Sequence, residues 1–216
     1  LMSIKKISIN KDISIAKTLT SDFYHSDYYF DKSISSIFKP SWQLITNRNA
    51  LHNSTIYPFT FLDGLVNEPA LLSTKNKAIY AFSNVCTHRG NILCDEQNNY
   101  KHIQCKYHGR TFNLNGKIKS APGFEGVNNF PTAKDNLKKL YLKEWKNFIF
   151  VSLKPNISFK KVFDDIENRL GWFPFDRLKF DNNNSNTYYL NAHWALYCEN
   201  YLEGFHVPYI HKGLNK

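Results

Sequence analysis

The chain has 216 residues, enough to bury at least one sizeable core, and its 42% hydrophobic and 16% aromatic content excludes a disordered protein. A net charge of +10 would suit an acidic partner or nucleic acid, but the basic residues are scattered singly or in short pairs such as Lys138-Lys139. We therefore expect a solvated basic surface and no nucleic-acid partner.

The N-terminal residues Leu1 to Lys6 lack the apolar run of a signal peptide, and no apolar stretch of the chain is long enough to span a membrane. Of the four cysteines, Cys94 and Cys198 have no obvious partner. We expect both to be reduced packing residues, as is typical of a reducing compartment. The sequence therefore predicts a cytoplasmic protein with no membrane partner.

Residues 1–40 are polar and predict an N-terminal arm with a helical turn over 33–38. Short runs typical of β-strands follow, separated by turn signals such as Asp63-Gly64 and Asn76-Lys77. These features predict an all-β domain from 40 to 155. The expected strands are residues 42–45, 58–62, 70–73, 78–83, 102–104, 111–114, 139–142 and 148–153.

Two short motifs stand out in this domain, Cys86-Thr87-His88 and Cys105-Lys106-Tyr107-His108. Predicted strands lead into both, and Asn115-Gly116 is a strong signal for a hairpin turn after the second. Each motif is followed by a glycine, Gly90 or Gly109, which suits a loop that turns tightly and brings N–H groups close to sulfur. We therefore expect both motifs at the tips of β-hairpins.

The four ligand-type side chains, Cys86, His88, Cys105 and His108, can hold a [2Fe–2S] cluster with both cysteines on one iron and both histidines on the other. A structural zinc site is an alternative, because Zn²⁺ also takes Cys₂His₂. Zinc ligands usually come as C-x₂₋₄-C and H-x₃₋₅-H, whereas each motif here mixes one cysteine with one histidine. Chance packing of buried residues is the other alternative.

Both motifs resemble the cluster loops of Rieske non-haem iron oxygenases, a family that includes aromatic-ring-hydroxylating dioxygenases and choline monooxygenase. The resemblance runs from about Tyr29 to the C-terminus and implies an oxygenase alpha subunit. High-potential respiratory Rieske proteins are also similar, but they carry an extra cysteine in each loop and hydroxyl donors where Arg110 and Phe112 stand here. We therefore expect a reduction potential toward the low end of about −150 to +300 mV.

After a boundary at Lys154-Pro155-Asn156, the apolar spacing over 159–170 predicts a helix closed by Gly171. An Asn-rich loop follows, and residues 187–190 predict the start of a strand. By the resemblance, 156–216 is the N-terminal part of a helix-grip (Bet v 1-like) catalytic domain. The expected fold class is therefore α+β.

The second candidate metal group lies near the end of the chain. Glu199, Glu203 and His206 have the spacing i, i+4 and i+7, which predicts one face of a helix. His211 would point elsewhere on an unbroken helix, but Pro208 can interrupt it and let the two imidazoles converge. Two histidines and a carboxylate form the facial triad of non-haem iron sites.

The resemblance implies that His206 and His211 bind a mononuclear Fe(II). It implies that Glu203 is the carboxylate that bridges to a cluster histidine of the adjacent subunit in a homotrimer. Asn200 is expected near the iron, and Glu199 is expected to be a structural helix residue. The family's third ligand is a carboxylate farther downstream, so we expect this sequence to be C-terminally truncated, with an open strand edge and a half-built core.

The implied activity of the intact protein is an NAD(P)H- and O₂-dependent mono- or dioxygenation. A reductase or ferredoxin passes electrons to the [2Fe–2S] cluster and on to Fe(II), where O₂ is activated to hydroxylate a small organic substrate. The run Asn200 to Leu214 resembles the choline monooxygenase-like branch. The alternatives are a Rieske ferredoxin-like electron carrier, an inactive fragment of the oxygenase, and a zinc-stabilised binding module.

Overall fold

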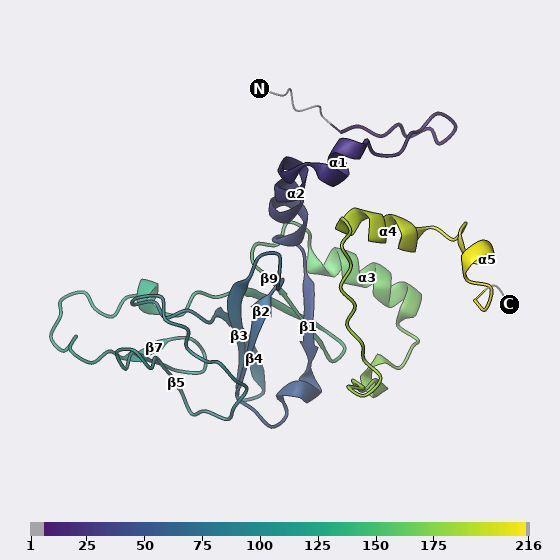
Figure 1. Ribbon diagram of the computed structural model, residues 1–216. Helices are drawn as coiled ribbons and strands as arrows, with labels where there is room; N and C mark the ends of the chain where they lie inside the picture. The colour runs from purple at the N-terminus through teal and green to yellow at the C-terminus, as the bar shows by residue number, and fades with distance from the viewer. Residues whose placement is uncertain (1–6, 215–216) are drawn as a thin grey trace, which may run out of the picture. The chain divides into compact units, whose positions relative to one another are not determined.

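The computed structural model describes residues 7–214, which belong to two compact units (Figure 1). The larger unit runs from Ile34 to Lys179. The smaller unit joins the chain before Ile34 to the chain after Lys179. The N-terminal arm and the C-terminal segment therefore share one unit, which is separate from the unit that carries the two Cys/His motifs.

The larger unit contains three small antiparallel sheets, with the strand orders β1-β9-β8, β2-β3-β4 and β5-β6-β7. All eight strands predicted between residues 40 and 155 are present, β4 with the predicted ends and the others with shifted ends, and one further strand, β7, was not predicted. β7 is short and half polar, so it carries little pattern of its own. The strands are β1 (Gln43–Asn47), β2 (Ile56–Phe61), β3 (Glu68–Lys75), β4 (Ala78–Ser83), β5 (Ile103–Gln104), β6 (Thr111–Phe112), β7 (Ile118–Ser120), β8 (Tyr141–Trp145) and β9 (Phe148–Ser152).

The predicted turn between β3 and β4 is a two-residue hairpin loop. Asn76 and Lys77 have φ angles of 52° and 66°, and Lys75 pairs with Ala78 across the loop. Positive φ at both loop residues matches the twist of the flanking strands, and asparagine tolerates it better than most residues. This hairpin delivers β4 directly into the first Cys/His motif.

Two buried clusters lie on opposite faces of the β2-β3-β4 sheet. In β3, Leu71 belongs to one cluster and Leu72 to the other, because successive side chains of a strand point to opposite faces. Phe82 and Ala81 of β4 divide in the same way. The cluster that contains Leu71 and Phe82 also contains three cysteines, so the motif loops are anchored in a core. Its members are Ile56, Leu71, Phe82, Cys86, Leu93, Cys94, Ile103, Cys105, Phe112 and Leu137.

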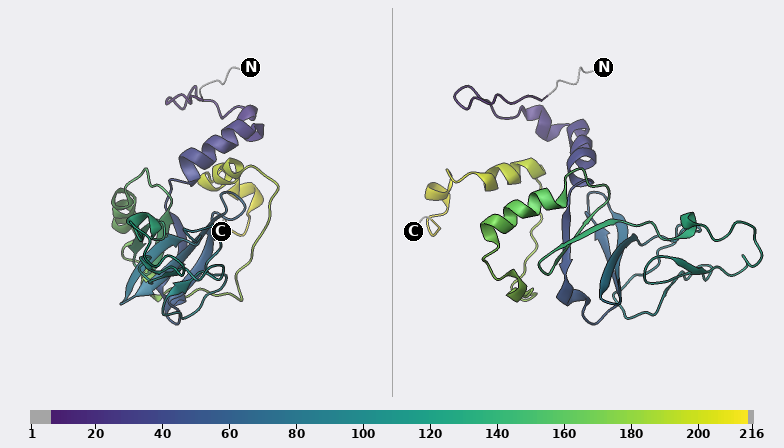
Figure 2. Two further views of the ribbon diagram at one scale, coloured as in Figure 1. Left: turned by 90° about the vertical axis from the view of Figure 1, so that its left-hand side faces the viewer. Right: turned by 180° about the vertical axis from the view of Figure 1, so that it is seen from behind.

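Helix α3 (Phe159–Leu170) has the predicted bounds and packs against the β1-β9-β8 sheet (Figures 1 and 2). The Phe163 ring lies 4.7 Å from the Phe150 ring and 5.6 Å from the Trp145 ring, measured between centroids. Because α3 makes these contacts, the larger compact unit extends beyond the boundary predicted near 155. A compact unit is defined by contacts within the fold and not by membership of a domain family. The predicted domain limits of 40–155 and 156–216 therefore stay predictions.

The smaller unit holds four helices of the described chain together with irregular segments. The Tyr24 hydroxyl donates to the Glu199 carboxylate at 2.7 Å, and the His193 ring lies 5.3 Å from Phe23. The first and last segments of the chain therefore pack on each other. The helices are α1 (Ser21–His25), α2 (Asp27–Ser33), α4 (Trp194–Leu202) and α5 (Val207–Ile210). In the larger unit, a π-helical turn over Ile34–Phe38 lies where the helical turn was predicted.

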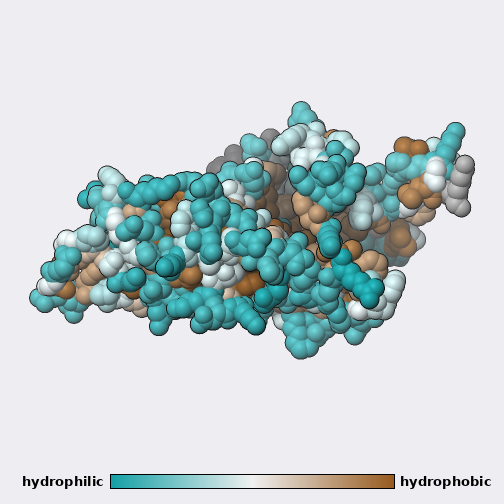
Figure 3. Space-filling model, turned by 90° about the horizontal axis from the view of Figure 1, so that it is seen from below, coloured by the Kyte–Doolittle hydropathy of each residue, from teal (hydrophilic) through white to brown (hydrophobic). Residues whose placement is uncertain are grey.

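The strand predicted to start at 187–190 is wrong, because these residues form no regular structure. Their side chains are exposed, with Tyr189 at 95%, and no described strand pairs with them. Other apolar residues of α4, α5 and the neighbouring segments are also exposed, and hydrophobic patches interrupt the hydrophilic surface in Figure 3.

The two remaining cysteines differ in their surroundings. Cys94 is buried in the core, as predicted, and burial raises the pKa of its thiol to about 11. Cys198 is exposed, so the prediction that it is a packing residue is wrong. It stands in α4, whose apolar residues are largely uncovered. In the described part of the chain, every helix is too short or too polar to cross a bilayer.

Candidate metal centre

The two Cys/His loops are built on the same hydrogen-bond pattern. The Cys86 N–H donates to the Asn91 carbonyl, and the Cys105 N–H donates to the Arg110 carbonyl, each at 2.8 Å. The loops close with the Gly90 and Gly109 N–H groups donating back to the carbonyls of Cys86 and Cys105, at 3.1 and 3.0 Å. The hairpin tips predicted from the sequence are therefore confirmed, and the loops match although their histidines differ in spacing.

The two glycines adopt backbone conformations that side chains rarely take. Gly90 and Gly109 have φ angles of 74° and 72°. A Cβ at Gly109 would also lie 3.3 Å from Cγ of Pro122, whereas a Cβ at Gly90 would meet no atom within 4 Å. Glycine is therefore required at Gly90 by backbone conformation, and at Gly109 by both conformation and space.

The four candidate ligands come together as two pairs. The Cys86 and Cys105 thiols are hydrogen-bonded to each other, and both residues are only 3% exposed. The His88 and His108 rings lie with their centroids 4.9 Å apart, at 64° to each other. Both rings line a cavity of about 220 Å³. The cysteine pair therefore sits inside the core, and the histidine pair sits at its edge.

Backbone N–H groups surround the sulfurs. Burial raises the pKa of the Cys86 thiol, partly offset by the His88 N–H. Burial also acts to raise the pKa of Cys105, but donors from the Tyr107 and His108 N–H groups and the Asn91 side chain bring it below its usual value. Donors aimed at sulfur favour the thiolate, which is the form that binds metal. Sequence reasoning missed Asn91, because no motif marks it.

The surroundings of the His88 ring favour its neutral form. Partial burial lowers the pKa of His88, and the positive charge of Arg110 lowers it further. A neutral imidazole has a free nitrogen to coordinate iron, whereas a protonated one does not. The residues therefore present buried thiols and a neutral imidazole within one site.

The pairwise arrangement matches the ligand grouping of an iron–sulfur cluster. A zinc site needs its four ligands around one point, in tetrahedral geometry. Within residues 7–214, no three His, Cys, Asp or Glu side chains are grouped to hold a single ion. A [2Fe–2S] centre of the Cys₂/His₂ type needs only two protein ligands on each iron, which is the grouping that Cys86/Cys105 and His88/His108 form.

Comparison with protein families decides between the alternatives. Residues 41–131 match the model of the Rieske [2Fe–2S] domain. The chain contains a Rieske domain. The match includes all four candidate ligands and implies the [2Fe–2S] cofactor, so the assignment of the two loops to a Rieske domain is confirmed.

Curated relatives extend the similarity beyond the Rieske domain. Choline monooxygenase of Arabidopsis thaliana is 29% identical over 92% of this chain and 49% of its own length. The carnitine monooxygenase oxygenase subunit of Escherichia coli K12 is 27% identical over 93% of this chain and 54% of its own length. The chain therefore spans about half the length of the curated relatives that it matches.

Solved structures share the fold. The quaternary ammonium Rieske monooxygenase CntA matches with a TM-score of 0.77 and 24% identity, over 91% of this chain and 55% of that one. Naphthalene 1,2-dioxygenase matches with a TM-score of 0.58 over 70% of this chain. The expected α+β class, with an all-β Rieske domain followed by the start of a further part of the same fold, is confirmed.

The second candidate group lies in the smaller unit and differs from the predicted helix face. Helix α4 ends at Leu202, and Glu203 has extended φ and ψ angles of −119° and 156°. The prediction that Glu199, Glu203 and His206 share one helical face is therefore wrong. The chain leaves the helix just before Gly204, where the Glu203 carboxylate accepts the Phe205 N–H and stabilises a turn.

The two histidines nevertheless converge, as predicted. The His206 and His211 rings lie 5.3 Å apart between centroids, and His206 Nδ1 is hydrogen-bonded to Glu203. Pro208 lies in the first turn of α5 and starts a new helix, a position that proline favours. Asn200 lies on the exposed surface of α4. The described residues offer this group two imidazoles and one carboxylate that is bonded to His206.

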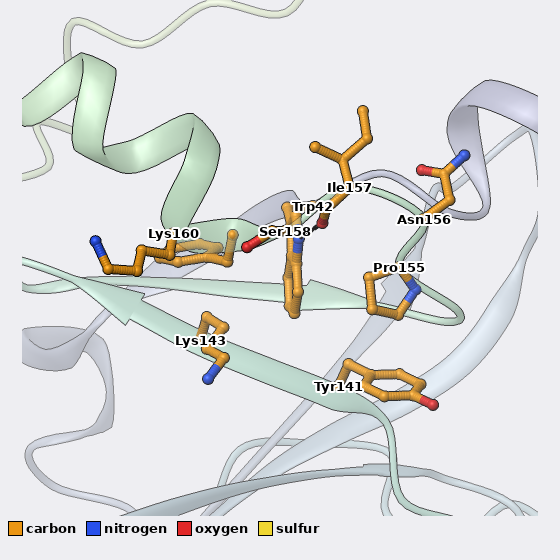
Figure 4. A pocket seen from close by; sticks show the side chains of 9 residues that line it. Trp42, Tyr141, Lys143, Pro155, Asn156, Ile157, Ser158 and Lys160 are labelled. Carbon is orange, nitrogen blue, oxygen red and sulfur yellow. Dashed lines mark hydrogen bonds between the residues drawn. The ribbon is translucent and has the colours of Figure 1, made fainter.

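The larger compact unit, residues 34–179, contains the Rieske domain and is called the Rieske unit below. A larger pocket of about 440 Å³ lies elsewhere in this unit (Figure 4). It is floored by Tyr141 and Lys143 of β8 and by Trp42, whose indole N–H donates to the Ile157 carbonyl at 3.0 Å. Its lining contains no cysteine, histidine or carboxylate.

Proposed function

We propose that this chain supplies the electron-accepting part of a Rieske-type oxygenase component. Cys86 and Cys105 would bind one iron of a [2Fe–2S] cluster, and His88 and His108 the other. One observation carries the proposal: two loops of identical hydrogen-bond pattern pair sulfur with sulfur inside the core and imidazole with imidazole at its edge. When bound, such a cluster supplies one-electron transfer.

The protein groups around the site have separate tasks. The Tyr107 and His108 N–H groups and the Asn91 amide stabilise the Cys105 thiolate. The core around Cys86 and Cys105 excludes water from the sulfurs. The His88 and His108 rings line the cavity at the edge of the site, and His108 is exposed, so we assign the passage of the electron to this side.

For the intact protein we propose the full oxygenase activity. A reductase or ferredoxin would deliver electrons from NAD(P)H, and a mononuclear Fe(II) held by His206, His211 and a further carboxylate would activate O₂. Glu203, bonded to His206, would bridge this iron to a cluster histidine of the next subunit in a homotrimer, and Asn200 would lie near the iron. The location would be cytoplasmic.

A quaternary ammonium compound is the substrate class that the relatives favour. Two of them are named choline monooxygenase and carnitine monooxygenase oxygenase subunit. Such a substrate requires aromatic faces around its cationic head. The exposed rings of Tyr201, Phe205 and Tyr209 are available near the two histidines in sequence.

A second candidate function is electron transfer alone. The compact unit 34–179 contains all four cluster ligands, whereas the His206/His211 group lacks a third ligand among the described residues. The 216 residues alone would then accept electrons without hydroxylating a substrate. The sequence predicts the same outcome for a truncated oxygenase.

Anaerobic reconstitution with iron and sulfide tests both candidates. We expect a coloured protein that gains an EPR signal on one-electron reduction and oxidises reduced ferredoxin without forming product from choline or carnitine. A colourless, EPR-silent protein that binds zinc would contradict the cluster assignment. Product formation by these residues would contradict the need for a further carboxylate.

A further inference from the structure

A buried arginine lies between the two ligand loops. Arg110 is 4% exposed and directly follows Gly109, which closes the second loop. Its side chain lines the same cavity as His88 and His108. A buried guanidinium is costly unless other groups compensate for its charge, so its surroundings are informative.

Arg110 connects three segments that are distant in sequence. Its Nη1 donates to Thr87 Oγ1 at 3.1 Å and lies 3.5 Å from Asp135 Oδ1. The Thr87 hydroxyl donates in turn to the Asp135 carbonyl at 2.8 Å. Thr87 lies between Cys86 and His88, so this network ties the first loop to the second and both to the turn at Ala133–Asp135.

The charge of Arg110 is only partly neutralised. Its carboxylate partner lies 3.5 Å away, at the long limit of a hydrogen bond, and the other Asp135 oxygen accepts the Thr132 N–H at 2.8 Å. The remaining neighbours are aromatic: the guanidinium carbon lies 5.5 Å from the Phe124 ring centre and 5.4 Å from that of Phe130. The guanidinium charge is therefore buried, with one distant carboxylate and two aromatic rings around it, beside the histidine pair.

The guanidinium charge lies close to the ligands. Arg110 lines the same cavity as the His88 and His108 rings, and its partner Thr87 belongs to the loop that carries Cys86. A positive charge at this place favours any added negative charge nearby, including an electron that enters the cluster.

We propose that Arg110 is a positioning residue that clamps the two ligand loops together and raises the reduction potential of the cluster, while Asp135 lowers it. The proposal rests on the [2Fe–2S] assignment. The two residues then act with opposite signs on one equilibrium, the uptake of a single electron.

The test is a redox titration of the reconstituted protein, with mediator dyes supplying the electron and visible circular dichroism reporting the fraction reduced. Arg110→Gln removes the buried charge, and Arg89→Gln is the matched control, because Arg89 is exposed and follows His88. We expect the potential to fall in R110Q by several times its change in R89Q. In Asp135→Asn we expect the potential to rise.

The outcomes separate the possible failures. If R110Q does not retain its cluster, Arg110→Lys is the second variant to measure. Lysine keeps the positive charge but lacks the planar guanidinium, and the reduction potential should stay near that of the wild type. Equal changes in R110Q and R89Q, or shifts of the same sign in R110Q and D135N, would overturn the electrostatic role. An unmodified protein that binds no cluster would instead overturn the proposed function.

Discussion

The two candidate metal groups of this chain contrast in how they are supported. The Cys/His loops are fixed by backbone hydrogen bonds, by glycines with positive φ and by a core that buries both thiols. His206 and His211 also converge, but they stand among uncovered apolar residues such as Phe205, which is 87% exposed. A site is preorganised where its supports fold with it, and the second group lacks these supports among residues 7–214.

The largest expected effect compares ligands of the two groups. Cys105→Ser removes a thiolate that serine cannot replace, so we expect complete loss of cluster colour and of bound iron. His206→Ala should leave both unchanged, because His206 does not belong to the Rieske unit. Iron analysis and visible absorbance after reconstitution measure the difference. Loss of the cluster in H206A would contradict the separation of the two groups.

A matched pair of phenylalanines compares the packing around the two candidate metal groups. Phe82→Ala empties a fully buried site in β4, and we expect it to cost about 3–5 kcal/mol of unfolding free energy. Phe205→Ala should change it by less than about 0.5 kcal/mol, because that ring is already exposed to water. Urea unfolding followed by circular dichroism measures both. Equal costs would mean that Phe205 is covered in solution.

A matched pair of glycines compares the backbones. Gly109→Ala places a Cβ at a φ of 72° and 3.3 Å from Pro122, and we expect a cost of about 1–2 kcal/mol. Gly204→Ala meets no atom within 4 Å and should cost less than half as much. The midpoint of urea unfolding reports both changes. A neutral G109A would show that the second loop can relax.

The smallest expected effect concerns the helix that extends the Rieske unit. The Glu167 carboxylate accepts from Lys146 and Trp145, each at 2.7 Å, and these bonds lower its pKa. Because the folded pKa is below the unfolded one, the unfolded chain binds the proton first as the pH falls. The stabilisation is therefore present above the ordinary glutamate pKa and is lost as the pH falls through the folded value.

We accordingly expect wild-type stability to decrease more steeply below pH 5 than that of Glu167→Gln. Asp165→Asn, which removes an exposed pair with Arg169 within the same helix, serves as the control. Urea unfolding at a series of pH values measures the slopes. Parallel slopes in the wild type and E167Q would remove the contribution assigned to this carboxylate.

Features with local signals could be predicted from the sequence. Alternating apolar residues located the strands, the apolar stripe of 159–170 located α3, and the Cys/His spacing located both loops. The helix through His206 was predicted wrongly, because spacing alone does not reveal that the chain leaves the helix at Glu203. The contacts of Thr87, Arg110 and Asp135 depend on folding across distant segments, so no local pattern announces them.

The central claim is that two hairpin tips share a pair of irons in unlike ligand environments. Mössbauer spectroscopy of the protein reconstituted with ⁵⁷Fe tests it most directly. The account predicts two irons per chain in two distinct environments, one with sulfur ligands alone and one that also has imidazole nitrogen. Two equivalent irons, or a single metal ion shared by Cys86, His88, Cys105 and His108, would contradict it.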